Sequence, residues 1–182
     1  MVLCSITGIS SHSFTNILFS IVCLWEIYPA PILIPGLFVG LIGGFFEEIG
    51  WTGFATPRLL SRFSFIKTAV ILGVIHSFWH LFADYLGGVD FYKTLYLFHF
   101  FLWIIALTVL RFFIIWIYNQ TGNLLLPILT HASFTGSQLI LTPSLNGAET
   151  ILWYAIFVVV LTILVLTIVI RKLKSQKVFA KE

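Results

Sequence analysis

Charged residues are scarce in this 182-residue sequence. They make up 9% of the chain, whereas hydrophobic residues make up 59%. Soluble domains usually have about 25% charged and about 45–50% apolar residues. The composition therefore excludes an ordinary soluble domain and predicts a single integral membrane domain over residues 1–182. We expect a cell membrane as its location and the lipid bilayer as its solvent.

Cysteine is also scarce, with Cys4 and Cys23 both near the N-terminus. Their number and spacing support neither a disulfide framework nor a cysteine-based zinc site. The formal net charge is +3, but the basic residues gather at 58–67 and 171–181, beside apolar runs. Such a distribution is typical of membrane topology rather than of a nucleic-acid interface. We therefore expect no nucleic-acid partner.

Breaks at proline, glycine and polar clusters divide the chain into apolar segments. A membrane-spanning helix needs about 20 mostly apolar residues. The pattern predicts an all-α, polytopic bundle of about six transmembrane spans. These are residues 13–28, 32–60, 65–86, 94–118, 123–141 and 150–171.

The basic residues also predict the orientation. If the basic tail 171–182 is cytoplasmic, an even number of spans places the cluster at 58–67 on the same side. Most lysines and arginines then lie inside, as the positive-inside rule requires. We therefore expect a cytoplasmic C-terminus.

A small set of ionisable residues remains within the apolar segments. Such residues are costly at membrane depth and are functional candidates by default. With a rise of about 1.5 Å per residue, the inner half of the bilayer contains Glu47, Glu48, His80, Arg111 and His131, which could line one cavity. His99 falls near the outer surface. The set is Glu47, Glu48, His76, His80, His99, Arg111 and His131.

Glu47 and Glu48 are adjacent, so one helix face cannot display both carboxylates. We expect one to face the cavity as a candidate general base while the other has a separate partner. The structural alternative is an ion pair with Arg58 or Arg111. Glycines surround the pair: Gly36, Gly40 and Gly44 predict close approach of a neighbouring helix, and Gly43 and Gly50 leave space beside Glu47.

His76 and His80 lie four residues apart and share a helix face. The spacing permits two ligands on one metal ion, although the segment lacks an HExxH pattern. A simple hydrogen bond to a neighbouring backbone is the alternative. His131 follows Pro127 by one turn, and with Thr135 it would present two donors on one face, as an oxyanion requires. Helix–helix hydrogen bonding is the alternative for this pair.

Three motifs in order, "EEIGWTGFATPR", "FWHL" and "LLLPILTHASFT", resemble the CPBP intramembrane protease family, the CAAX-processing and bacteriocin-processing (Abi) enzymes. The resemblance covers residues 36–138 and implies a protease-like core at about 32–141. It implies a glutamate-dependent endopeptidase in which Glu47 and His80 activate a water. Glu48 matches the second motif glutamate, and His131 matches the histidine that helps to stabilise the oxyanion.

Two positions depart from the family pattern. Thr52 stands where the first motif has arginine, and Thr135 stands where the third has asparagine or a similar residue. A threonine still donates a hydrogen bond, but the first change removes a positive charge. We hypothesise that Arg111 supplies that charge; both departures bear on whether the chain is a competent enzyme.

The residues permit two chemistries and three functions. A glutamate and a histidine can activate water without a cofactor, which the resemblance favours, or Glu47, His80 and His131 could hold Zn²⁺. The favoured function is cleavage of a peptide or membrane-protein substrate, with prenylated CAAX-type, bacteriocin or leader peptides as candidates. The first alternative is a non-catalytic protein of bacteriocin immunity or partner binding. The second, an ion-coupled transporter, is weakened because no inverted repeat is visible.

Overall fold

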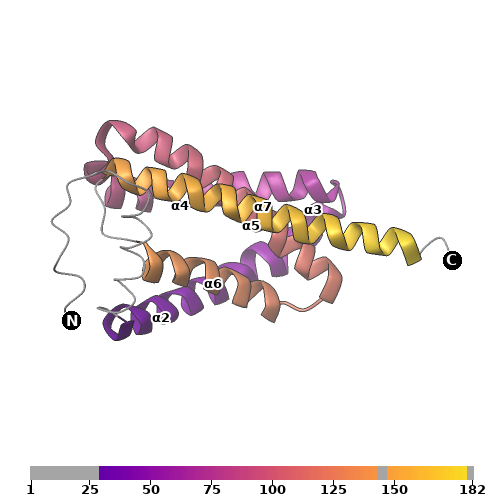
Figure 1. The fold of residues 1–182 in the computed structure, drawn as a ribbon. Coiled ribbons are helices and arrows are strands. Elements are labelled where there is room, and N and C mark those ends of the chain that lie inside the picture. The colour runs from indigo at the N-terminus through magenta and orange to yellow at the C-terminus, as the bar shows by residue number, and fades with distance from the viewer. Residues whose placement is uncertain (1–28, 143–146, 180–182) are drawn as a thin grey trace, which may run out of the picture.

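The computed structural model describes residues 29–142 and 147–179, and every regular element in these ranges is helical. The prediction of an all-α bundle is confirmed. Figure 1 shows the helices as one elongated bundle. In chain order they are α2 (Pro29–Glu48), the π-helix η1 (Ile49–Ala55), α3 (Thr56–Leu60), α4 (Phe65–Tyr92), the 3-10 turn η2 (Lys93–Leu95), α5 (Tyr96–Thr121), α6 (Leu125–Leu141) and α7 (Gly147–Phe179).

Four of the described helical stretches are long and apolar enough to cross a membrane: Ile32–Leu60, Phe65–Leu86, Gly88–Thr121 and Gly147–Val169. Their outer faces carry large apolar side chains such as Phe82 and Leu97, which are 75% and 78% exposed. The chain is therefore a multi-pass membrane protein. Helix α6 is apolar but shorter, and the predicted span 13–28 lies outside the described residues, so the number six stays a prediction.

Two helices are longer than the predicted spans. The span Phe65–Leu86 is confirmed, but helix α4 continues beyond it to Tyr92, with the glycines at 87 and 88 inside the helix. The chain turns at Lys93, whose φ of 49° is unusual for a residue with a side chain. Helix α7 continues to Phe179, so residues 171–179 of the predicted tail are helical.

The predicted glycine stripe on α2 is confirmed as a helix contact, and α6 is the neighbour. A Cβ at Gly40 would lie 2.5 Å from the carbonyl oxygen of Ala132, and one at Gly44 would lie 2.7 Å from that of Ile128. Both are closer than packed atoms tolerate, so only glycine permits this approach. The contact brings the end of α2 against the middle of α6.

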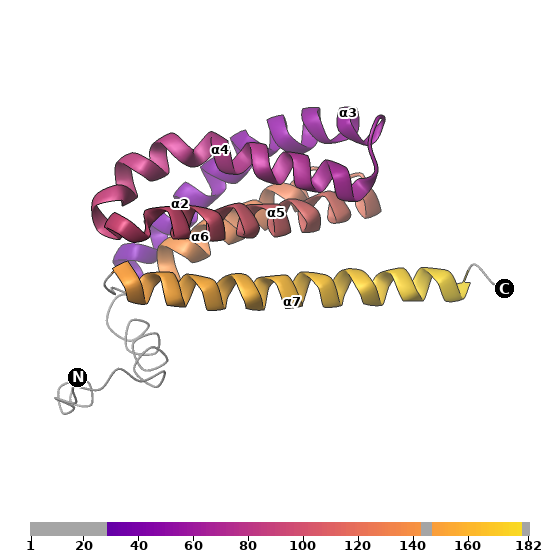
Figure 2. The same cartoon turned by 90° about the horizontal axis from the view of Figure 1, so that it is seen from above.

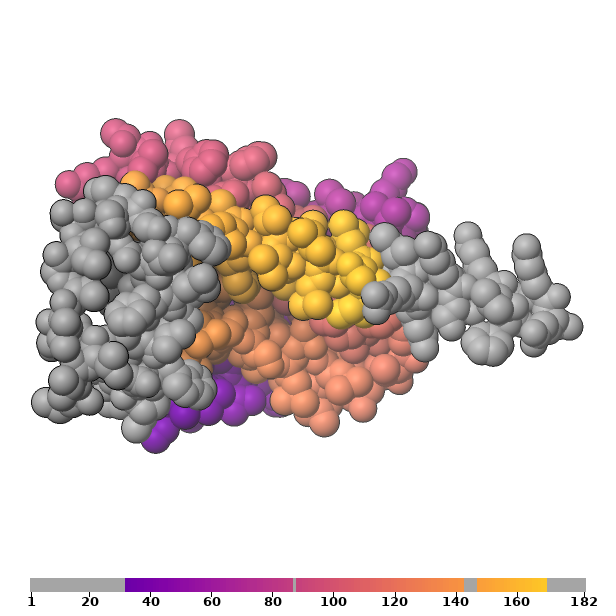
Figure 3. All heavy atoms as spheres, viewed as in Figure 1, coloured from indigo at the N-terminus to yellow at the C-terminus, as the bar shows by residue number. Residues whose placement is uncertain are grey.

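Helices α4 and α5 form an antiparallel pair that also depends on glycine. A Cβ at Gly73 would lie 2.4 Å from the Cα of Thr108. Helix α7 packs on α5, where Leu107, Leu110 and Tyr154 belong to one buried apolar cluster. Figure 2 shows α7 as a long outer helix beside the others, and Figure 3 shows it along the middle of one face. The ionisable candidates lie on the other four long helices. These are Glu47 and Glu48 on α2, His76 and His80 on α4, Arg111 on α5 and His131 on α6.

Candidate active site

Glu47 and Glu48 end α2, and their side chains diverge as the sequence predicted. Glu48 is fully buried, whereas the side chain of Glu47 is 23% exposed. A Cβ added at Gly50 would meet no atom within 4 Å, and one at Gly43 would meet only Oε1 of Glu47, at 3.9 Å. Glu47 is therefore the carboxylate with open space beside it, and Glu48 is the enclosed one.

The Glu48 carboxylate is surrounded by hydrogen-bond donors. Arg111, on α5, donates from Nη1 to Oε2 at 2.9 Å and from Nη2 to Oε1. The Thr52 hydroxyl donates to Oε2, and Nδ1 of His131 lies 2.6 Å from Oε1. A two-point arginine bond is the strongest pairing available to a buried carboxylate. Glu48 is thus held rigidly as one half of a buried ion pair.

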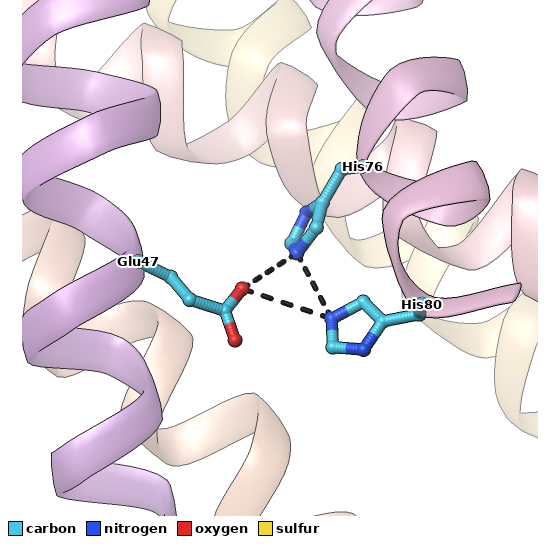
Figure 4. A group of neighbouring side chains, drawn as sticks. All are labelled: Glu47, His76 and His80. Carbon is cyan, nitrogen blue, oxygen red and sulfur yellow. Dashed lines mark hydrogen bonds and ion pairs between the residues drawn. The ribbon is translucent and has the colours of Figure 1, made fainter. Parts of the chain in front are cut away.

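Glu47 faces three histidines. Its Oε2 is 2.8 Å from Nε2 of His76, 3.7 Å from Nε2 of His80 and 3.9 Å from Nε2 of His131. Nε2 of His80 is also 3.2 Å from Nε2 of His76. Figure 4 shows Glu47 reaching from α2 toward the two histidines of α4. The carboxylate oxygen is therefore the point on which the three rings converge.

Arg111 joins the two halves of the site. Besides Glu48, its Nε donates to Nδ1 of His76 at 3.2 Å, and its Nη2 is 3.3 Å from Nδ1 of His131. The side chain is completely buried. One guanidinium thus contacts the enclosed carboxylate and both of the buried histidines.

A π-helix follows the two glutamates. Within Ile49–Ala55 the helix is wider than an α-helix, and the Thr56 hydroxyl donates to the carbonyl oxygen of Trp51 at 2.8 Å, five residues earlier. Thr52 and Thr56 are both fully buried. Segments of π-helix are rare and often lie at functional sites. Here the wide turn carries Thr52, which occupies the position of the motif arginine, against Glu48.

Most of the predicted site residues come together, and two do not. Arg58 is exposed and donates to the carbonyl oxygen of Phe54 at 2.9 Å, with its guanidinium over the ring of that residue. The sequence offered Arg58 or Arg111 as the ion-pair partner of a glutamate. In the structure the pair is between Arg111 and Glu48. Thr135 is half-buried, and among the described residues no hydrogen bond joins it to the cluster. His99 stacks on Tyr92, away from the site, as its depth predicted.

The sequence underestimated His76. The motifs give it no catalytic role and predict at most a supporting one, yet it is fully buried and makes the shortest histidine contact to Glu47. Its four-residue spacing from His80 was the available signal, because that spacing places both rings on one face. What the spacing could not show is which ring lies closer to the carboxylate.

The compact group of possible metal ligands also includes His76. The ligand atoms of Glu47, His76 and His80 all lie within 4.8 Å of one another. The zinc set considered from the sequence contained His131 in place of His76. His131 instead directs Nδ1 to Glu48 and brings Nε2 only to 3.9 Å from Glu47.

A family model and one curated protein match this chain, and both are described as CAAX prenyl proteases. Residues 29–137, more than half of the chain, match the family model described as type II CAAX prenyl endopeptidase Rce1-like. The CAAX prenyl protease 2 of Methanococcus maripaludis is 43% identical over 47 residues, which are 26% of this chain and 17% of that protein. The match thus spans less than a fifth of the relative's length. No solved structure matches the chain.

Proposed function

Because the chain belongs to the type II CAAX prenyl endopeptidase Rce1-like family, we propose that it is an intramembrane endopeptidase that uses Glu47 and His80 to activate water. One observation carries the proposal: a half-buried carboxylate faces three histidines beside open space. The second carboxylate, Glu48, is occupied by Arg111 and is not free to compete for the water.

In the proposed reaction Glu47 takes a proton from a water whose oxygen attacks the peptide carbonyl. Oε2 of Glu47 and Nε2 of His80 are 3.7 Å apart, so one water can hydrogen-bond to both. Glu47 passes this proton to Nε2 of His80, and His80 delivers it to the nitrogen of the amine that leaves. The C–N bond breaks, and a carboxylic acid and an amine are released.

The developing oxyanion needs donors, and we assign this role to His131 with Thr135 one turn later. Nε2 of His131 is 3.9 Å from Oε2 of Glu47. Nε2 can donate only while it carries a proton, so this role belongs to the substrate-bound site and not to the resting ring, in which Nδ1 holds the proton toward Glu48. Thr135 completes the pair when substrate is bound.

The residues support a mechanism without a cofactor, and we propose no metal requirement. The alternative would place Zn²⁺ on Glu47, His76 and His80, the group whose ligand atoms lie within 4.8 Å of one another, where it would polarise the water. Phenanthroline and EDTA separate the two mechanisms, because only a zinc-dependent activity is lost with the metal.

The substrate class follows from the relative and not from the site. The curated relative is a CAAX prenyl protease, so we propose a prenylated CAAX-type peptide, with bacteriocin or leader peptides as the next candidates. Such a peptide would enter from the side on which the basic residues gather. That side is the cytoplasm if the C-terminus lies there, as the positive-inside rule predicts.

One observation favours a second function. The motif arginine is replaced by Thr52, and a protein that binds a peptide without cleaving it, for example in bacteriocin immunity, does not need that charge. The Arg111–Glu48 pair argues for catalysis because it restores a cation at Glu48.

The test compares peptide termini in membranes that contain wild-type protein, Glu47→Gln or Asp90→Asn at equal abundance. Glu47→Gln keeps the shape of the side chain but removes the base, so cleavage should fall by about 10²–10⁴-fold. Asp90 is an exposed carboxylate near the far end of α4, and its amide variant is the matched control. Termini present with wild type and Asp90→Asn alone establish proteolysis. Identical termini in all three samples contradict it and favour partner binding.

A further inference from the structure

Arg111 lies between a carboxylate and a histidine on different helices. Its terminal nitrogens bind Glu48, while its Nε donates to Nδ1 of His76 at 3.2 Å. An arginine side chain carries N–H donors and no acceptor. Nδ1 of His76 must therefore hold a lone pair and no proton.

The proton of a neutral His76 ring then belongs on Nε2, because one of the two nitrogens must carry it. Nε2 lies 2.8 Å from Oε2 of Glu47, so this N–H donates to the carboxylate. It also lies 3.2 Å from Nε2 of His80. Two N–H groups would repel at that distance, so Nε2 of His80 holds a lone pair.

His131 has the opposite arrangement. Its Nδ1 is 2.6 Å from Oε1 of Glu48, a distance that two acceptors without a shared proton do not reach. The proton therefore lies on Nδ1, and Nε2 of the neutral ring holds a lone pair. Nη2 of Arg111 is 3.3 Å from the same Nδ1, but it donates to Oε1 of Glu48. The two buried histidines are held in different tautomers by the two members of one ion pair, Arg111 and Glu48.

We propose that Arg111 is a positioning residue that fixes His76 in the Nε2–H tautomer, so that His76 orients Glu47 and leaves His80 free to accept a proton. The catalytic consequence rests on the proposed function, whereas the tautomers follow from the hydrogen bonds alone. Arg111 would thus do more than replace a missing charge. Its Nε would determine which histidine acts as donor and which as acceptor.

The same tautomer determines how the cluster treats metal ions. The ligand atoms of Glu47, His76 and His80 are 2.8, 3.2 and 3.7 Å apart. A tetrahedral zinc ion with bonds of about 2.0–2.1 Å needs about 3.3 Å between its ligands, so the triangle has the right size. A ligating histidine, however, offers a lone pair to the metal and donates its other N–H to an acceptor. While Arg111 is present, Nδ1 of His76 accepts the arginine N–H, and Nε2, which faces Glu47 and His80, carries a proton instead of a lone pair.

The first test measures the tautomers in full-length wild-type protein in detergent micelles or lipid nanodiscs. Ring nitrogens of ¹⁵N-labelled histidine have different chemical shifts with and without a proton. His76→Gln and His131→Gln spectra assign the two rings. We expect the proton of His76 on Nε2 and that of His131 on Nδ1. A proton on Nδ1 of His76 overturns the proposal.

The second test uses Co²⁺, whose visible absorption reports tetrahedral binding, on wild type and on Arg111→Ala/Thr52→Arg. The double variant keeps a cation beside Glu48 but removes the donor to His76. We expect it to bind Co²⁺ about 10–100-fold more tightly than wild type, the range over which hydrogen bonds to a ligating histidine alter metal affinity. A further His76→Phe change should abolish the gain.

Equal Co²⁺ affinity of wild type and double variant, with both lowered by His76→Phe, contradicts the proposal because His76 would then ligate despite Arg111. Neither test measures peptide cleavage. A protein that cleaves nothing but has the expected tautomers would refute the proposed function alone. A competent protease with the opposite His76 tautomer would refute this inference alone.

Discussion

Arg111→Ala would leave the Glu48 carboxylate buried without the guanidinium that binds it at both oxygens. Removing one partner of a buried ion pair typically costs about 3–5 kcal/mol, because the remaining charge has lost its compensation. Thr52 and His131 still donate to Glu48, so we expect the lower half of this range. For a chain of this size, the unfolding temperature should then fall by about 6–16 °C.

Thr52→Arg should recover much of this loss when it is combined with Arg111→Ala. Thr52 is fully buried and already contacts Glu48, so an arginine there would approach the same carboxylate from its own helix. The volume that Arg111 vacates gives the new side chain room. The wild-type background lacks that room, and there Thr52→Arg should destabilise the protein by overpacking and by repulsion between the two guanidinium groups.

The assay is thermal unfolding of purified protein in detergent, with Arg111→Ala/Thr52→Met as the matched control for side-chain size. If charge is what Glu48 lacks, the Thr52→Arg double variant unfolds at a clearly higher temperature than the Thr52→Met one. Equal unfolding temperatures would refute the reasoning, because they would show that Arg111 stabilises the bundle by packing and not by pairing with Glu48.

Three further variants test other features by unfolding in detergent. Gly40→Ala should destabilise the protein by about 1–3 kcal/mol because its Cβ would lie 2.5 Å from the backbone of α6. Gly50→Ala should not, because a Cβ there meets no atom within 4 Å. Equal effects of the two variants would contradict the close packing of α2 on α6. Lys93→Gly should raise the unfolding free energy by up to about 1 kcal/mol by relieving its positive φ, and a loss would show that the lysine side chain matters more. Arg58→Ala should change the unfolding free energy by less than about 0.5 kcal/mol and leave cleavage unchanged, since the residue is exposed and outside the site. A loss of cleavage would show that Arg58 contributes to the site.

The sequence was sufficient to predict the membrane class, the divergence of the two glutamates and the glycine contact of α2. It also selected Arg111 as a candidate partner, because the depth of a residue along a helix follows from its position in the chain. These predictions depend on helix periodicity and on the cost of burying charge, and both are properties of short stretches of sequence.

The remaining features depend on how helices meet. The closeness of His76 to Glu47 reflects the rotation of α4 against α2, which the sequence of neither helix specifies. The extension of α4 to Tyr92 could not be read from the two glycines, which are tolerated in a helix but also typical of a break. The π-helix had no visible signal either, since its bonds differ from those of an α-helix by one residue only.

The π-helix at Ile49–Ala55 changes what a motif written as a fixed spacing means. In an α-helix, each residue advances the direction of the side chains by about 100°. Where each backbone bond spans five residues instead of four, counting positions after Glu47 no longer gives the direction of the side chain. A motif matched by spacing alone therefore does not show which side chain in this segment faces Glu48, whereas the hydrogen bond from Thr52 does.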